Sequence, residues 1–286
     1  MLRLLQFKKK VTGFELMGFN EVFLEPDLVH QGKIADMGAF KTSLHELFEE
    51  SQPYPVKAGN LYVNIPDNLV YSFVKDFPHH AVHRSICPLM MDSARKHLPV
   101  PFEDLHPEFA SVTTDHKVSY ALYASPKKWR ERLSKACKEF GVKSIEFIPE
   151  SVASVTLAEY EQGEDFALFS GYRGGISLSL FHNGLLYDSY YFGDFENELP
   201  ADCSADCMSE FERAQADFEE TFGRDFDRLI FIGFESAHEK KIGKLFEKRG
   251  YDLNFIGSEH SDLNALIPYE KGRTVLFGLF NYLMKR

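Results

Sequence analysis

The chain has 286 residues, of which 44% are hydrophobic, enough to bury a substantial core in one large or two medium units. Its 43 acidic and 32 basic side chains give a formal net charge of −11, which argues against a nucleic-acid-binding protein, and the only short basic run is Lys8-Lys9-Lys10. Four scattered cysteines and no apolar run near the roughly 18 residues of a membrane span predict a cytoplasmic protein without a disulfide framework. In "MLRLLQFKKK" the charges follow the apolar residues, the reverse of a signal peptide.

Hydrophobic periodicity predicts mixed helices and strands in the first half of the chain. In chain order we expect a helix at residues 37–51, strands at 60–66 and 68–78, and a turn with a short helix at 78–101. A strand at 116–125, a helix at 126–141 and a strand at 142–149 follow. The first helix presents one apolar face, formed by Phe40, Leu44, Leu47 and Phe48. Gly141 stands where a C-cap glycine is expected for the second helix.

The second half of the chain predicts a three-stranded meander followed by alternating helices and strands. Strands "FALFS" and "ISLSLF" flank a loop with three glycines, and His182-Asn183-Gly184 is a hairpin turn because its central residues tolerate positive φ. The meander ends with a strand at residues 185–193, and an acidic loop at 194–206 follows. The remaining elements are a helix at 208–223 capped by Gly223, a strand at 228–233, a helix at 236–249, a strand at 251–257 and a terminal helix at 272–286.

This order of elements resembles the actin-like ATPase superfamily and, more narrowly, the PilM family of pilus assembly proteins, which is related to FtsA. The resemblance covers nearly the whole chain and is carried by "FKKKVTGFEL", "LVHQGKIADMGAFKTSLHELFEE", "NLYVNIPDNLVYSFVKDFP", "VPFEDLHPEFASV", "WRERLSKACKEFGVKSIEFIPESVASV" and "RLIFIGFES". It implies an α/β, actin-like fold with two ribonuclease-H-type lobes. The implied parts are lobe I at 1–76, an inserted α/β subdomain at 77–149, and lobe II with a C-terminal helix at 150–286.

The family's second phosphate loop reads approximately "alvDiGas.t.lsv..dG", and an ungapped alignment places Ser170 at the aspartate and Tyr172 at the glycine. A serine hydroxyl carries no charge to hold a magnesium-bound water, and tyrosine removes the close backbone approach that glycine allows. For the first phosphate loop the candidate is "GFELMG", with Glu15 for the aspartate and Met17 for the glycine. In a second alignment "VTGFEL" is the following strand, and no loop remains.

At the family's adenosine motif, "GFES" keeps Gly233 and has Phe234 in place of the second glycine. Phosphate binding depends on backbone donors together with a metal ion, so three altered motifs predict a pseudo-ATPase with no catalytic residue and no bound cofactor. ATP with Mg²⁺ is the alternative. The vestigial nucleotide cleft implied by the resemblance comprises Glu15, Ser170, Gly171, Arg173, Gly174, Gly233 and Ser236.

Other patterns favour structural interpretations. "GYRGG" could form an anion-binding nest with Arg173 as its cation, but we favour a hairpin turn. "HHAVHRSIC" places His79, His83 and Cys87 at i, i+4 and i+8, too far apart along a straight helix for one tetrahedral ion, and Pro88 follows. "CSADC" has no partner pair, so we expect no metal site, and the lack of a G-x-S-x-G elbow argues against a hydrolase.

Phe192 and Phe195 lie beside the acidic loop, where either core packing or an exposed partner patch fits the pattern. The family resemblance implies a non-catalytic scaffold or adaptor of a type IV pilus or related secretion assembly, at the inner face of the inner membrane. Family members bind a cytoplasmic peptide of the membrane protein PilN between the core lobe and the insert, and self-association is a further expectation. The alternatives are an ATPase with a remodelled pocket and a GspL-like platform domain of a type II secretion system.

Overall fold

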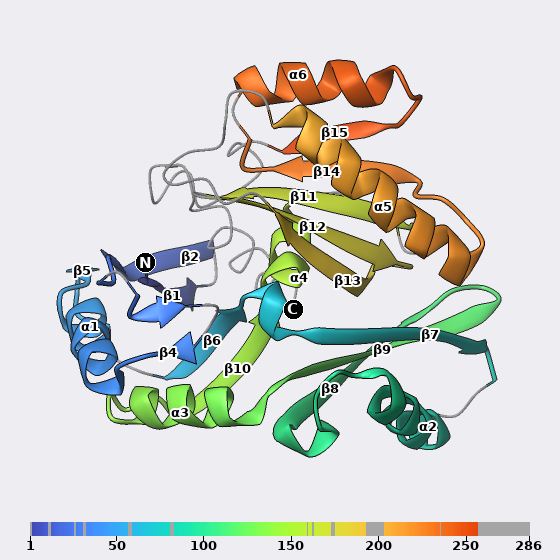
Figure 1. The fold of residues 1–286 in the computed structure, drawn as a ribbon. Helices are drawn as coiled ribbons and strands as arrows, with labels where there is room; N and C mark the ends of the chain where they lie inside the picture. Colours follow the sequence, from blue (N-terminus) through green and yellow to red (C-terminus); the bar gives the residue numbers. More distant parts are fainter. Residues whose placement is uncertain are drawn as a thin grey trace. The chain divides into compact units, whose positions relative to one another are not determined.

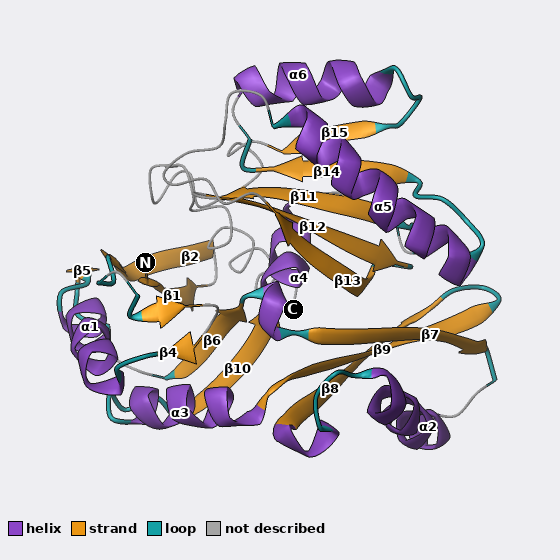
Figure 2. Ribbon diagram, viewed as in Figure 1, coloured by secondary structure: helices purple, strands orange, loops and turns teal. Residues whose placement is uncertain are grey.

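The structure is a computed structural model. It describes residues 2–10, 13–25, 27–30, 33–56, 59–80, 83–158, 160–161, 163–172, 175–192, 203–234 and 236–256. The chain forms two compact units: unit 1 comprises Met1–Leu69 and Pro126–Ile148, and unit 2 comprises Val70–Ser125 and Pro149–Arg286. Both units mix helices and strands (Figures 1 and 2). Within the described residues, no helix is both long enough and apolar enough to cross a membrane.

Unit 1 contains seven described strands in three hydrogen-bonded groups, ordered β1-β2-β5, β6-β10 and β3-β4. The strands are β1 (Leu2–Lys10), β2 (Gly13–Val22), β3 (Val29–His30), β4 (Lys33–Ile34), β5 (Gln52–Pro53), β6 (Asn60–Ile65) and β10 (Ser144–Pro149). A 3-10 turn, η1 (Asp67–Leu69), follows Pro66, which ends β6 as predicted. The basic run Lys8-Lys9-Lys10 lies inside β1.

Helix α1 (Met37–Glu49) of unit 1 packs against the turn that follows helix α3 (Lys127–Lys138) through aromatic side chains. Helix α1 begins after Asp36, whose carboxylate caps it by accepting from the Gly38 backbone N–H at 2.7 Å. Its predicted apolar face is confirmed, since Phe40, Leu44, Leu47 and Phe48 are all buried. Helix α3 (Lys127–Lys138) is followed by Phe140, which stacks on Phe48 with ring centroids 5.1 Å apart.

Unit 2 contains a three-stranded sheet, ordered β7-β9-β8, which we call the insert sheet. Its strands are β7 (Tyr71–Pro78), β8 (Leu105–Thr113) and β9 (Lys117–Pro126), and β7 pairs antiparallel with β9. Helix α2 (His83–His97) packs Ile86, Met90 and Ala94 into a core with these strands, and the 3-10 turn η2 (Phe102–Asp104) adds Phe102. The helix is longer than the short helix predicted, and Pro88 lies inside it.

The second sheet of unit 2, which we call the main sheet, has the order β13-β12-β11-β14-β15. The strands are β11 (Phe166–Tyr172), β12 (Gly175–His182), β13 (Leu185–Phe192), β14 (Arg228–Ile232) and β15 (Leu253–Ile256). The first three form the predicted antiparallel meander, while β14 runs parallel to both β11 and β15. Positive φ angles at Asn183 (52°) and Gly184 (77°) confirm the hairpin turn.

Two helices cover one face of the main sheet, α5 (Ser204–Phe222) and α6 (Ser236–Glu247). Phe211 and Phe218 from α5, Phe246 from α6, and Phe169 and Phe231 from the sheet meet there in one buried cluster. The opposite face is also buried, because Ser179 is fully inaccessible and Phe166 stacks on Phe181 at 4.6 Å. Strand β12, in which apolar residues alternate with serines, is therefore covered on both faces. Two short elements, α4 (Glu150–Ser154) and η3 (Val155–Leu157), precede the sheet in the chain.

The predicted insert at 77–149 is divided between the units, since residues 126–148 pack within unit 1. The acidic segment 194–206 is shorter than predicted, as α5 already begins at Ser204. The predicted terminal helix at 272–286 lies outside the described residues. The five-stranded ribonuclease-H-type order is complete in the main sheet of unit 2, whereas the described strands of unit 1 fall into separate groups.

Candidate functional site

The carboxyl ends of β11 and β14 bring together four of the residues predicted for the nucleotide cleft. In the parallel register Ser170 lies opposite Ile232, so Gly171 and Gly233 follow at the same edge, and α6 begins at Ser236. Gly233 has φ of 79°, which explains why glycine stands at the turn out of β14. We call Ser170, Gly171, Gly233 and Ser236 the carboxyl edge, and open α/β sheets usually bind ligands at such an edge.

Ser170 is a neutral and buried side chain at this edge. It is 5% exposed, and its Oγ has no hydrogen-bond partner among the described residues. The strand register places it directly across from Ser177 of β12. The side chain that aligns with the family's aspartate therefore supplies no negative charge at the position where a metal-bound water would need one.

The predicted glycine loop is a short connection between paired strands. Tyr172 pairs with Gly175, so just Arg173 and Gly174, both outside the described residues, join β11 to β12. This register confirms the hairpin interpretation of "GYRGG". A Cβ at Gly175 would lie 2.1 Å from Oη of Tyr191, whose ring crosses this position from β13. A side chain at position 175 would therefore require the Tyr191 ring, which is 60% exposed, to move aside.

The other predicted cleft residues lie in regular structure. Glu15 and Met17 are inside β2 of unit 1, where Glu15 pairs with Lys8, so the segment "GFELMG" is a strand and the second alignment applies. Phe234 follows Gly233, and its ring packs edge-on against Phe231 at 5.8 Å. A phenylalanine directed at the core thus stands where the family has its second glycine.

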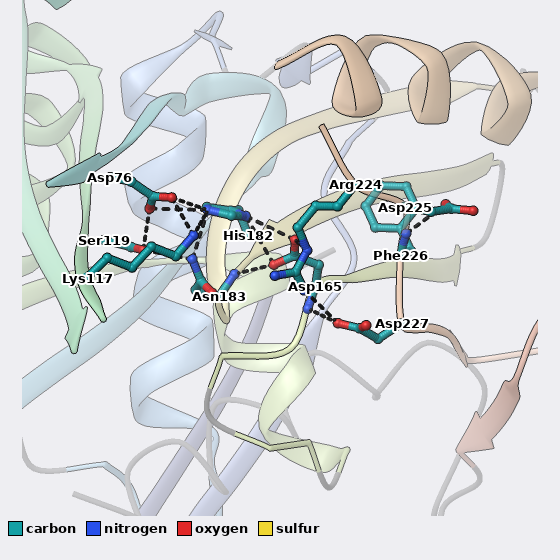
Figure 3. Close-up of polar contacts among 10 residues, drawn as sticks. All are labelled: Asp76, Lys117, Ser119, Asp165, His182, Asn183, Arg224, Asp225, Phe226 and Asp227. Atoms are coloured by element: carbon teal, nitrogen blue, oxygen red, sulfur yellow. Dashed lines mark hydrogen bonds and ion pairs between the residues drawn. The ribbon is translucent and has the colours of Figure 1, made fainter. Parts of the chain in front are cut away.

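A dense polar network lies at the opposite end of the β11–β12 hairpin (Figure 3). Asp165, directly before β11, is completely buried, and its carboxylate accepts three hydrogen bonds. The donors are the Asn183 backbone N–H at 2.7 Å, Nε of Arg224 at 2.7 Å and Nδ1 of His182 at 3.1 Å. The buried charge is therefore matched by a guanidinium and an imidazole. The backbone N–H of Asp165 in turn donates to Asp227 at 2.8 Å.

His182 connects this carboxylate to a second one on the insert sheet. The imidazole is 1% exposed, and its Nε2 lies 3.1 Å from Oδ2 of Asp76 in β7. Asp76 also accepts from Nζ of Lys117 and Oγ of Ser119, both in β9, at 2.5 Å. The antiparallel register explains this grouping, since it places Ser119 directly opposite Asp76. Figure 3 shows these side chains converging on the imidazole.

We call Asp76, Lys117, Ser119, Asp165, His182, Asn183 and Arg224 the clasp, because together they join the insert sheet to the main sheet within unit 2. Phe222 of α5 covers the imidazole face, with ring centroids 3.9 Å apart. The Asn183 amide fits its neighbours when its oxygen accepts from Nε2 of His182 at 2.8 Å and its nitrogen donates to the Gly163 carbonyl at 3.1 Å. Every polar atom of the imidazole then has a partner.

The clasp favours a charged imidazole. Burial by itself would lower the pKa of His182, but hydrogen bonds to Asp165 and Asp76 and the charges of both carboxylates raise that pKa above its ordinary value. Burial would likewise raise the pKa of Asp76, but hydrogen bonds from His182, Lys117 and Ser119 hold it well below its usual range. The result is an imidazolium with both ring nitrogens donating to carboxylates.

Comparison with known proteins identifies the fold. No protein-family model and no curated protein sequence matches the chain. Among solved structures, a chain of the PilM–PilN type IV pilus biogenesis complex superposes with a TM-score of 0.70 at 13% identity, covering 97% of this chain and 94% of that chain. The fold is actin-like and PilM-like.

Two further structures superpose less closely. A Bacteroides thetaiotaomicron protein with an actin-like ATPase fold has a TM-score of 0.45 at 13% identity, covering 89% of this chain and 85% of its own. The cytoplasmic domain of EpsL, an inner-membrane component of the Vibrio cholerae type II secretion system, has a TM-score of 0.49 at 11% identity, with 86% and 81% covered.

The remaining predicted patterns occupy ordinary structural positions in this PilM-like fold. His79 lies in an exposed turn after β7 whereas Cys87 lies in α2, so the histidine pattern does not share one helix. Cys203 precedes α5 and Cys207 lies in its first turn, and both are buried free thiols. A hydrogen bond with Cys203, together with burial, raises the pKa of Cys207. Among the described residues no group of three or more His, Cys, Asp or Glu side chains could hold a metal ion.

Phe192, the described member of the predicted aromatic patch, is partly buried against the core of the main sheet, and Phe195 lies outside the described residues.

Sequence reasoning missed the clasp, since it treated His182 as a turn residue and Asp76 as one polar position in a strand. A usable signal was present: the charged Asp76 stands in a predicted strand between the apolar Val74 and Phe77, and His182 directly follows the buried Phe181. Ser119 donates to Asp76 rather than to the imidazole, so the arrangement differs from a serine nucleophile that is hydrogen-bonded to a histidine base.

Proposed function

We propose that this chain is a non-catalytic, cytoplasmic adaptor of a type IV pilus or related secretion assembly, which binds a cytoplasmic peptide of an inner-membrane partner of PilN type. The observation that carries the proposal is the superposition on a chain of the PilM–PilN complex, because it extends over 97% of this chain and 94% of the other.

The carboxyl edge supports the non-catalytic part of the proposal. Actin-like ATPases need a charged side chain and an open approach for phosphates and a metal ion, and Ser170 offers a buried neutral hydroxyl instead. Tyr191 covers Gly175, and Phe234 packs against Phe231. These aromatic side chains fill space around the two turns at which the family would bind the nucleotide.

Titration with the partner's peptide tests the adaptor role. The cytoplasmic segment of the PilN-type protein from the same organism would be synthesised and titrated into the full chain by calorimetry, with a scrambled peptide as control. We expect saturable one-to-one binding to the native sequence alone. No heat at high micromolar peptide, in a sample whose folding is verified by circular dichroism, would contradict the proposal.

A second candidate, an ATPase with a remodelled pocket, is favoured by one observation: the Ser170 hydroxyl is buried and has no partner among the described residues. A bound nucleotide could supply that partner. Thermal unfolding with ATP and Mg²⁺ separates the two functions, since a ligand at ~100 times its dissociation constant adds ~2.7 kcal/mol of stability. We expect an unchanged melting temperature, and a clear rise would favour the ATPase.

A further inference from the structure

Helix α3 of unit 1 is strongly basic in an acidic protein. Its sequence "KKWRERLSKACK" carries six lysine or arginine side chains and one acid, Glu131, whereas the whole chain has a formal net charge of −11. The cations are spaced at intervals instead of forming a run. Their position on a folded helix therefore decides whether they act together.

The fold gathers five of the six cations on one exposed face. At about 100° per residue, Lys127, Lys128, Arg132, Lys135 and Lys138 fall within an arc of about 140°, and all five side chains are exposed. The opposite side of α3 is occupied by the buried Leu133, Ala136 and Cys137. We call the five cations the basic face.

Acidic side chains near the basic face compensate little of its charge: the exposed Glu131 lies inside the same arc and offsets one of the five cations. Glu139, the acid directly after α3, is paired with Lys41 of α1 at 2.6 Å. The sixth cation, Arg130, is turned inward and lies over the ring of Phe147 at 4.4 Å. Within the described part of the chain, none of the five cations of the basic face forms an ion pair or hydrogen bond through its side chain.

We propose that the basic face of α3 docks on the anionic surface of a phospholipid bilayer. Attraction to anionic lipid headgroups needs several juxtaposed cations and little else, and each contributes separately. A protein partner would instead require apolar or aromatic anchors, and the aromatic side chains of this region face inward: Trp129 packs on Phe147 and Phe140 on Phe48. This inference goes beyond the adaptor function and does not depend on the PilN-type partner.

Nucleic acid fits the observations less well than a bilayer does. A duplex offers phosphates on a curved backbone that proteins normally engage from several elements, and the 43 acids of this chain oppose such wrapping. A planar anionic surface can be met by one straight helix of 12 residues. The contact would be peripheral and reversible, and it would orient unit 1 with α3 toward the headgroups.

Vesicle co-sedimentation of the full chain tests the proposal. The vesicles would contain phosphatidylcholine alone or phosphatidylcholine with phosphatidylglycerol, at about 0.1 M and about 1 M salt, between which the Debye length falls from about 10 Å to about 3 Å. We expect binding to the anionic vesicles at the lower salt, and loss of binding at the higher salt or without phosphatidylglycerol. No excess binding to anionic vesicles at the lower salt would overturn the proposal.

A matched pair of triple variants separates the basic face from net charge. The first, K128E/R132E/K135E, reverses three cations of α3, and the second, K240E/K244E/K248E, makes the same charge change at exposed positions on or just after α6. We expect the α3 variant to bind at least about tenfold more weakly and the α6 variant to bind like wild type apart from a small general repulsion. Equal losses in the two variants would show that net charge alone is responsible and would contradict the proposal.

Fluorescence provides a second and local readout. Trp129 is the single tryptophan of the chain and lies in α3 itself. Anionic vesicles whose headgroups carry a fluorescence quencher should reduce its emission in wild type and in the α6 variant more than in the α3 variant. Sedimentation with no such difference between the variants would place the contact elsewhere and overturn the assignment to α3. Capture of acidic peptide or DNA without vesicle binding would overturn it in favour of another anionic partner.

Discussion

The two ends of the β11–β12 hairpin differ sharply in chemistry. At one end Ser170, Gly171 and Gly175 present no charge, and the Ser170 hydroxyl lacks a partner among the described residues. At the other end Asp165 and His182 are buried, charged and fully hydrogen-bonded. Both ends belong to the same two strands, so the contrast arises from side chains and not from backbone architecture.

This difference indicates which end of the hairpin the structure depends on. In actin-like ATPases the charged end of this hairpin is the one that meets the nucleotide. In this chain the charges stand at the opposite end, where they join the main sheet to the insert sheet. The charged groups of this hairpin thus hold two sheets of unit 2 together, an arrangement that is compatible with the proposed scaffold function. Substitutions at the two ends should therefore have different consequences.

The largest effect is expected for D165N. The variant removes the buried charge that pairs with Arg224 and His182, and removing one partner of a buried ion pair typically costs about 3–5 kcal/mol, in this case because the His182 imidazole stays buried without one of its two carboxylates. Urea unfolding measures the loss. The control is D92N on α2, whose carboxylate forms an exposed pair with Arg95 and whose loss should stay within about 0.5 kcal/mol. Equal effects of the two variants would contradict the importance of the clasp.

The stability of unit 2 should depend on pH in a way set by the clasp. Because the pKa of His182 is raised in the folded state, its contribution is complete below the ordinary value of 6.5 and is lost as pH rises through the folded pKa. Because the pKa of Asp76 is lowered, its contribution is complete above the ordinary value of 3.8 and is lost as pH falls through the folded pKa. The two groups together predict that unit 2 is most stable between pH 3.8 and pH 6.5.

Urea unfolding at several pH values checks this prediction. One proton can change stability by at most about 1.4 kcal/mol per pH unit. Wild type should lose stability as the pH rises above 6.5, and H182Q should be less stable overall and lack this decline. The groups facing the imidazole are Asp76, Lys117, Asn183, Asp165 and Arg224, and none of them is altered in H182Q. An unchanged decline in H182Q would assign the titration to another group.

A carboxylate introduced at the carboxyl edge should have a smaller cost and no functional gain. S170D introduces the carboxyl group of the family's motif at a site 5% exposed, where burial favours its neutral form, and we expect a loss of about 1–3 kcal/mol. With ATP and Mg²⁺ the variant should show no rise in melting temperature, because the other two motifs are also altered. A clear rise would mean that the remainder of the nucleotide site is intact.

The smallest effects come from matched serine-to-alanine changes at the two ends. S170A removes a buried hydroxyl without a partner among the described residues, so it should be neutral or stabilise by up to about 1 kcal/mol. S119A removes the hydroxyl that donates to Asp76 and contacts Asn183, so it should cost about 1–2 kcal/mol. If the order were reversed, the contrast between the two ends would not hold.

The sequence predicted the elements of the main sheet because their signals are local. Asn183-Gly184 specifies a hairpin, Gly223 with φ of 68° ends α5, and the aromatic side chains of α5 repeat at helical spacing. The grouping of elements was less accessible, since residues 126–148 pack with the first part of the chain through contacts distant in sequence. The basic face was missed for a related reason: its cations are separated in sequence and converge only when the helix forms.

The candidate site likewise contains residues that the sequence predicted and residues that it did not. Ser170 and Gly233 were predicted to lie together through a family pattern, and the parallel register of β11 and β14 places them at one edge. The clasp could not be predicted, because Asp76 and His182 are 106 positions apart and each, taken alone, resembles a surface residue. A single sequence shows which residues could be charged, whereas pairing across sheets depends on long-range packing.

The path of the chain constrains how the protein can be dissected. Each unit is built from two separate segments, and Val70–Ser125 and Pro149–Arg286 together form unit 2. A fragment starting at residue 149 would contain Asp165 and Arg224 but would leave His182 without its acceptor on β7. To produce either unit alone, its two segments must therefore be fused. A cut anywhere between residues 70 and 149 separates the two segments of one unit and divides the other unit as well.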